Sequence, residues 1–126
     1  MNEQEKTSSR RETAILDSFE FGRLAAFPEG VQDEIGSALS VAQFGGKHPS
    51  AKPWKGTGPG ISEIVEDHRG DAYRAIYTVR YANAVYVLHA FQKKSRSGIR
   101  TPKRDVDLIA QRLKLAQQDY EERHEN

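Results

Sequence analysis

Two segments rich in Tyr, Val, Ile and Phe stand close together in the sequence: AYRAIYTVRY, residues 72–81, and AVYVLHAFQ, residues 84–92. Aromatic and β-branched residues are enriched in strands, and Asn83 between the segments tolerates the backbone of a tight turn. ISEIVED, residues 61–67, precedes them as a third candidate strand, followed by a turn at DHRGD. These segments predict an antiparallel meander, around which the rest of the chain has to pack.

Helices are predicted on both sides of this meander. Asp17 and Glu20 have the spacing of a capping box and open a short helix that Pro28 ends. A second helix runs to Gly45 and Gly46, with apolar residues at helical spacing: Val31, Ile35, Leu39 and Ala42. A closing helix enters at Thr101 and Pro102, and its apolar stripe comprises Val106, Ile109, Leu113, Ala116 and Tyr120.

These elements predict one α+β domain: an N-terminal helical hairpin on a small antiparallel sheet of three to four strands, with a C-terminal helix. A short strand is also expected around residues 13–16. The length of 126 residues suits a single domain, which we expect at residues 13–122, between flexible tails at 1–12 and 123–126. We expect the helices to cover one face of the sheet and to leave the other face free to bind.

The composition of the chain limits the cell compartments and the classes of protein that are compatible with it. The chain has no Cys, so disulfides and Cys-based zinc sites are excluded, and a reducing compartment is compatible. The start of the chain carries charges of both signs without an apolar stretch, and no segment approaches the roughly 20 apolar residues of a membrane span. We therefore expect a cytoplasmic protein that does not use a membrane.

Positive charge gathers where the last predicted strand ends. Residues 92–114 contain eight Lys and Arg against two Asp, although the formal net charge of the whole chain is only +1. A local basic patch on a nearly neutral protein suits a polyanionic ligand. The alternative is a basic loop and helix face that are simply solvated. We weigh this explanation about equally with a binding patch.

The turn between the last two predicted strands decides which side chains share a face. A loop of two or four residues places Arg74, His89 and Lys93 on one face, whereas a three-residue loop groups Arg74 with Leu88, Gln92 and Lys94. Converging cations would indicate a bound anion. Two structural alternatives remain open: His89 is a core histidine, and Arg74 pairs with an acid of the preceding strand, namely Glu63, Glu66 or Asp67.

The loop at residues 45–60 is rich in Gly and Pro and places Lys47, His48, Lys52 and Lys55 around Trp54. An indole flanked by cations suits stacking on single-stranded RNA. Trp54 equally suits a plug that fixes the loop to the core, which is the commoner use. GTGPG, residues 56–60, is not a P-loop, because no Gly-Lys-Ser/Thr and no helix follow it.

The run GDAYRAIYTVRYANAVYVLHAFQKKSRSGIRTPKRDVDLIAQRL resembles the RelE/ParE toxin superfamily, and most closely its phage-related HigB-like branch, which includes the toxins of Tad-Ata-type modules. The shared pattern joins a "YR" pair, "LHAF" with paired lysines, and "TP" before the last helix. AKPWKGTGPGISEIVED is similar to the "KPLKG" block that comes before it in that family. The resemblance covers about residues 25–120.

The resemblance implies a RelE-like fold and a toxin of a type II toxin-antitoxin module, neutralised by an antitoxin that is commonly a helix-turn-helix protein. Many relatives cleave mRNA on the ribosome. The motifs carry the catalytic positions over to Arg74, His89, Lys93 and Lys94. RNA contacts are expected from Lys52 or Lys55 of the "KPLKG" block and, on the basic segment and the loop, from Trp54, Arg96 and Arg100.

Such a reaction needs neither metal nor cofactor, because the ribose 2′-OH attacks the neighbouring phosphorus and leaves a 2′,3′-cyclic phosphate. In this hypothesis Arg74 grips the phosphate, Lys93 and Lys94 stabilise charge, and His89 or a lysine transfers the proton. Three alternatives remain: a ParE-like gyrase inhibitor, an inactive toxin relic that only binds its antitoxin, and a simple RNA-binding domain.

Overall fold

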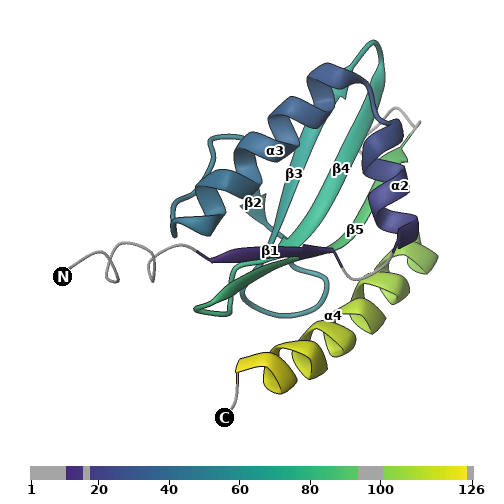
Figure 1. Ribbon diagram of the computed structural model, residues 1–126. Coiled ribbons are helices and arrows are strands. Elements are labelled where there is room, and N and C mark those ends of the chain that lie inside the picture. The colour runs from purple at the N-terminus through teal and green to yellow at the C-terminus, as the bar shows by residue number, and fades with distance from the viewer. Residues whose placement is uncertain (1–10, 16–17, 94–100, 125–126) are drawn as a thin grey trace, which may run out of the picture.

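The computed structural model describes residues 11–15, 18–93 and 101–124. The elements follow in the order β1 (Glu12–Ile15), α2 (Ser18–Ala26), α3 (Glu29–Gln43), β2 (Ala51–Pro53), β3 (Ile61–His68), β4 (Asp71–Thr78), β5 (Ala84–Lys93) and α4 (Lys103–His124). The strands form one sheet in the order β1-β5-β4-β3-β2, in which β1 runs parallel to β5 and the others are antiparallel (Figure 1). The predicted α+β fold is confirmed.

Local chemistry fixes the helical hairpin of α2 and α3. Pro28 occupies the N-cap position of α3. At the other end Gly45 adopts a φ of 85°, and the amides of Gly45 and Gly46 donate to the last turn of the helix, at 3.0 Å each. The Gln32 side chain donates to the carbonyl oxygens of Ala25 and Phe27, at 3.1 and 2.8 Å. Gln32 thereby ties the end of α2 to α3.

A two-residue turn sets the register of β3 against β4. Arg69 and Gly70 both have positive φ angles, 52° and 89°, which suits the tight turn between His68 and Asp71. Only Gly adopts such angles without cost, so Gly70 is required by the backbone. The turn places Glu63 directly opposite Ile76.

A bulge in β5 changes which of its side chains face which way. Ile76 pairs with His89, the register that a loop of two or four residues predicts, but Tyr77 pairs with Val87, so the strand gains one residue at Leu88. A regular alternation in this register would put Tyr86 and Leu88 on the face opposite Ile76, and the bulge makes that expectation wrong. Tyr86 and Leu88 pack in the same apolar cluster as Ile76.

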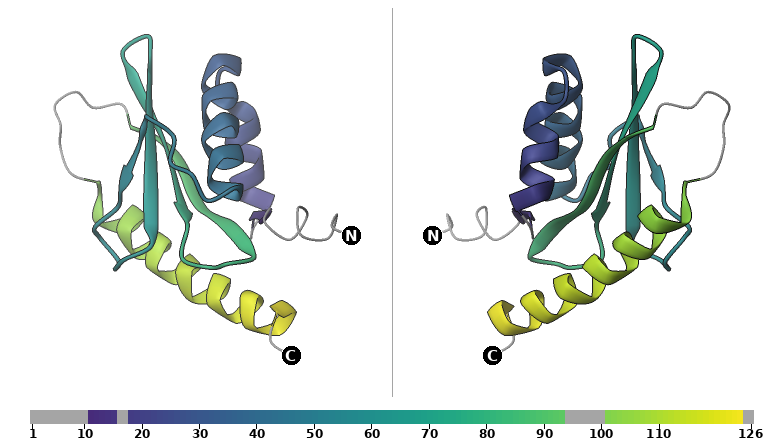
Figure 2. Two further views of the ribbon diagram at one scale, coloured as in Figure 1. Left: turned by 90° about the vertical axis from the view of Figure 1, so that its left-hand side faces the viewer. Right: turned by 90° about the vertical axis from the view of Figure 1, so that its right-hand side faces the viewer.

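The sheet carries an apolar cluster on each face, so the expectation that one face stays free is wrong. The first cluster lies under the helical hairpin and includes Val31, Ile35, Ala38, Ala42, Ile64, Tyr73, Ala75 and Tyr77. The second lies under α4 and includes Trp54, Ile61, Ile76, Tyr86, Leu88, Phe91, Ile109 and Ala116. Figure 2 shows α2 and α3 on one side of the sheet, with α4 beginning on the other side. The second face is called the α4-side face below.

Aromatic and polar contacts hold the C-terminal half of α4. The Tyr86 hydroxyl donates to Asp119 at 2.6 Å, and the rings of Tyr81 and Tyr120 stack with centroids 4.4 Å apart. Burial, with the hydrogen bond to Asp119, raises the pKa of Tyr86 well above its usual value. The phenol therefore stays neutral and keeps donating. None of the helices that the structure describes is both long and apolar enough to cross a membrane.

Trp54 fixes the loop between β2 and β3 to the α4-side face. Its side chain is buried in the second cluster, and its amide donates to Ile61 at 2.8 Å. Gly56 lies against the ring: a Cβ at this position would come within 2.8 Å of Trp54 Cζ2. Glycine is thus needed for the close approach of loop and indole.

Gly56→Ala should lower the free energy of unfolding by about 1–3 kcal/mol, because the added methyl group pushes the indole out of its packed position. Trp54 is the only tryptophan of the chain, so its fluorescence reports on that displacement directly. The measurement is urea unfolding followed by fluorescence, with a red-shifted emission maximum expected for the folded variant. Gly30→Ala is the control, since nothing lies within 4 Å of a Cβ there. An unshifted spectrum would contradict the packing.

Candidate functional site

Cross-strand pairing places a row of side chains on the α4-side face. The row runs from the edge strand inward through directly opposed residues: Lys52, Glu63, Ile76 and His89. The neighbouring row consists of Val65, Arg74 and Phe91. Directly opposed residues share a face, so Arg74 and His89 lie on the same side of the sheet.

The Arg74 side chain forms an ion pair with Glu63 in the middle of this face. Nη1 of Arg74 donates to Oε2 of Glu63, and the two side chains are 18% and 6% exposed. The ion-pair alternative for Arg74 is therefore realised, with Glu63 as the acid. Within the described part of the chain, Nε of Arg74 has no hydrogen-bond partner. The guanidinium is held in place but keeps an unsatisfied donor.

His89 lies deeper in the same face. Its side chain is fully buried, Nε2 lies 2.8 Å from Oδ1 of Asp105, and its ring stacks on Phe91 with centroids 4.8 Å apart. A general acid or base has to come within hydrogen-bond distance of the substrate, and this imidazole does not reach solvent. In this structure His89 ties β5 to the first turn of α4, which agrees with the core-histidine alternative.

The loop cations lie at the exposed edge of the site. Lys52 on β2 and Lys55 after it are both exposed, whereas Trp54 between them is buried. Trp54 therefore fits the plug alternative and presents little ring surface for stacking. Lys52 stands opposite Glu63, the acid that pairs with Arg74.

The remaining predicted residues cannot be placed with their side chains. The backbone of Lys93 ends β5 opposite Ala72, but its side chain lies outside what the structure describes. Lys94, Arg96 and Arg100 lie wholly outside the described residues. Their predicted roles remain predictions.

A comparison with models of protein families shows to which family the chain belongs. The model described as Phage derived protein Gp49-like (DUF891) matches residues 23–114, which is most of the chain. The chain belongs to this family. The Gp49-like family lies in the RelE-type toxin group. No curated protein and no solved structure matches the sequence significantly.

The matched region of this Gp49-like protein contains the whole Arg74–Glu63 pair, His89 and the "KPWKG" loop. Together they form a partly covered surface with one fixed guanidinium, one buried carboxylate and an exposed ammonium group. A guanidinium that is already oriented suits bidentate contact with a phosphate group. The site can therefore grip an anion without ordering a flexible side chain first.

The sequence predicts Glu63 only as one of three possible partners of Arg74. In the structure it is the acid that holds the guanidinium in the site. Glu63 is 5% exposed and is opposed by Lys52 on one side and Ile76 on the other. The two-residue Arg69-Gly70 turn contains the information needed, because it fixes the pairing of β3 with β4. A two-residue turn at this point places Glu63 and Arg74 on the same face of the sheet.

Metal-ligating side chains do not cluster in the described part of this Gp49-like protein. Among those residues, no group of three or more His, Asp or Glu side chains is arranged to hold a metal ion. The nearest approach to one in the site is the His89–Asp105 contact, which is used to join β5 to α4.

Glu63→Gln should lower the free energy of unfolding by roughly 1–3 kcal/mol, because the Arg74 charge loses its partner in a poorly solvated position. The matched control is Asp107→Asn, which removes the acid of the exposed Lys103–Asp107 pair and should cost at most about 0.5 kcal/mol. Urea unfolding curves of both variants and the wild type provide the comparison. Equal costs for the two variants would contradict a structural role for the Arg74–Glu63 pair.

Proposed function

We propose that this Gp49-like protein is the toxin of a type II toxin-antitoxin module and cleaves mRNA on the ribosome without a metal ion. The observation that carries the proposal is the Arg74 guanidinium, which Glu63 holds in place on a side chain that is 18% exposed. A guanidinium has five N–H donors, more than one carboxylate accepts, so donors remain for contact with a phosphate oxygen. Membership of a family in the RelE-type toxin group supports the same function.

In the proposed reaction Arg74 grips the scissile phosphate and Glu63 holds the guanidinium in the required orientation. The ribose 2′-OH attacks phosphorus, its proton passes to a base, and the 5′-oxygen leaves with a proton from an acid. Lys93 ends β5 and Lys94 comes next in the sequence; the two are assigned the stabilisation of the added negative charge and the proton transfer. His89 is assigned a positioning role, since its ring is buried and contacts Asp105.

Lys52 and Lys55 are assigned to the RNA backbone on either side of the cleaved bond. Both are exposed at the β2 edge, where the α4-side face opens to solvent. Contacts of this kind contribute affinity that falls with salt and does not depend on sequence. The ribosome and its mRNA are the proposed targets, and a helix-turn-helix antitoxin is the proposed partner.

Arg74→Gln should abolish growth arrest on induction and slow mRNA cleavage by about 100-fold or more, because the fixed guanidinium is lost from the transition state. The measurements are growth after induction and mapping of mRNA 5′ ends after a brief pulse. Because Arg74→Gln leaves Glu63 unpaired, Glu63→Gln combined with Arg74→Gln checks that loss of activity does not follow from instability. Arg23→Gln, at an exposed position on α2, is the charge-matched control and should remain toxic.

Several results would contradict the proposal. Arrest that persists in Arg74→Gln, with translation intact and DNA supercoiling altered, would indicate a gyrase inhibitor instead. A wild-type chain that causes no arrest but binds an antitoxin would indicate a relic. Salt-dependent binding of free RNA with no cleavage on ribosomes would indicate a simple RNA-binding domain.

A further inference from the structure

An apolar groove lies between α2 and α3, on the side of the molecule that carries the helical hairpin. Its lining consists of Phe21, Leu24, Ala25, Gln32, Ile35, Gly36 and Leu39, around a volume of about 190 Å³. Sites for small molecules usually measure roughly 300–1,000 Å³, so this volume suits side chains of a partner better than a metabolite.

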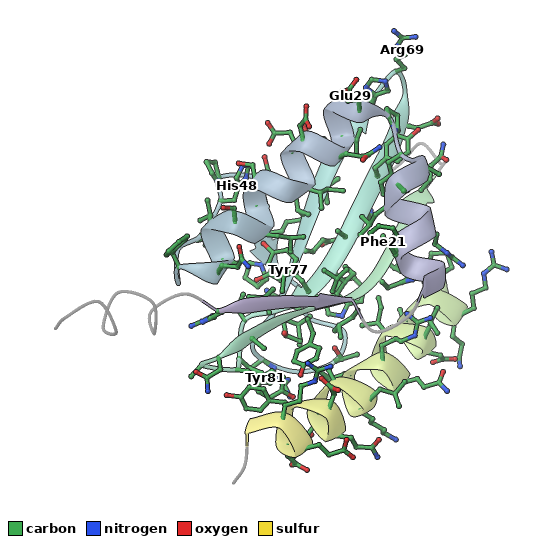
Figure 3. The ribbon with its side chains drawn as sticks, viewed as in Figure 1. Phe21, Glu29, His48, Arg69, Tyr77 and Tyr81 are labelled. Carbon is green, nitrogen blue, oxygen red and sulfur yellow. The ribbon has the colours of Figure 1, made fainter. Side chains whose placement is uncertain are left out.

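Phe21 is the least explained side chain of the hairpin. It is 61% exposed at the wall of the groove, and Figure 3 shows it on α2. A single exposed apolar residue is ordinary, but this one adjoins a concave surface that is itself apolar. An apolar surface of this kind between two helices is the usual receptor for an amphipathic helix.

Gly36 is the second feature that packing within the chain leaves unexplained. It lies in the interior of α3, where Gly is the poorest helix former apart from Pro, and it lines the groove. Nothing lies within 4 Å of the position of a Cβ at Gly36, so no neighbour in the described structure requires glycine there. The absence of a side chain allows the backbone of another chain to approach closely.

Charge beside the groove limits what can occupy it. Glu29 and Asp33 are exposed on α3 and lie along the helix surface in line with Gly36. Two carboxylates on the helix that forms one wall of the groove repel nucleic acid and favour Lys or Arg on a partner.

We infer that the α2–α3 groove receives an amphipathic helix of the cognate antitoxin, with large apolar side chains toward Phe21 and basic residues toward Glu29 and Asp33. This inference rests on the proposed toxin function. The groove and the Arg74–Glu63 pair lie on opposite sides of the sheet. The docked helix therefore lies on the side of the sheet away from the Arg74 side chain.

The test uses the full chain and the purified product of the adjacent reading frame, taken as the candidate antitoxin. Phe21→Ser and Gly36→Gln should each raise the dissociation constant by roughly 30-fold or more, as expected at the centre of an interface. Both variants should still arrest growth, and co-expressed antitoxin should no longer rescue them. Isothermal titration calorimetry and rescue of growth provide the two measurements.

The controls match each change. Leu115→Ser removes an exposed apolar side chain from α4, and Gly30→Gln makes the same substitution on α3 at a position that does not line the groove. Both should bind antitoxin within about threefold of wild type, a change too small for a hot spot. Gly36→Ala should raise the melting temperature by a few degrees, since a methyl group fits and improves helix propensity.

Three results would overturn the inference. Phe21→Ser and Gly36→Gln binding as tightly as wild type would place the antitoxin elsewhere, while the proposed toxin function would stand if arrest and rescue were intact. Self-association of the wild type that Phe21→Ser abolishes would identify the occupant as a second copy of the chain. A wild-type chain that forms no complex with the neighbouring product would contradict the assigned occupant. Binding that depends on Phe21 without any growth arrest would support the groove and contradict the toxin function.

Discussion

The ion pair between Arg74 and Glu63 joins two neighbouring strands on a face that α4 covers only in part. An arginine in this position is expensive to bury without a partner, and a carboxylate is equally so. Each therefore requires the other, and together they hold a guanidinium at a fixed place, with the exposed Lys52 opposite Glu63 on the edge strand. Pairing with an acid does not disqualify an arginine from binding phosphate, because its five donors exceed what one carboxylate accepts.

The bulge in β5 connects this site to the last helix. It adds a residue at Leu88 and keeps both Leu88 and Tyr86 on the side that α4 covers. His89, next in the chain, meets Asp105 in the first turn of α4. The helix is thereby fastened at its start by a polar contact, and further along by Ile109, Ala116 and the Tyr86–Asp119 hydrogen bond. In the sequence, the basic segment joins the end of β5 to the start of α4.

Much of the fold follows from local chemistry that the sequence displays. The meander could be predicted from aromatic and β-branched residues, and the hairpin from Pro28 and the Gly45-Gly46 pair, because these residues act on their own backbone. The bulge could not, since it depends on how Leu88 and Tyr86 pack against a helix that follows later in the chain. The prediction of a free face, made by assigning all the helices to one side of the sheet, was wrong because α4 packs on the side opposite α2 and α3.

The candidate site was predictable to a similar degree. Arg74 and His89 on one face follow from the pairing of Ile76 with His89, which the sequence predicted. The burial of His89 was not predictable, because it results from Phe91 and Asp105 closing over the ring. Glu63 was visible as a possible partner of Arg74, although its choice over Glu66 and Asp67 required the Arg69-Gly70 turn.

The two apolar clusters lie on opposite faces of the sheet. A domain built in this way need not open as a single unit. Loss of the contacts of α4 would uncover Ile76, Phe91 and the Arg74 side of the sheet while the layer beneath α2 and α3 kept its packing. We therefore expect the layer of α2 and α3 to stay folded when α4 detaches, so that a ligand that displaces this helix leaves the rest of the molecule in order.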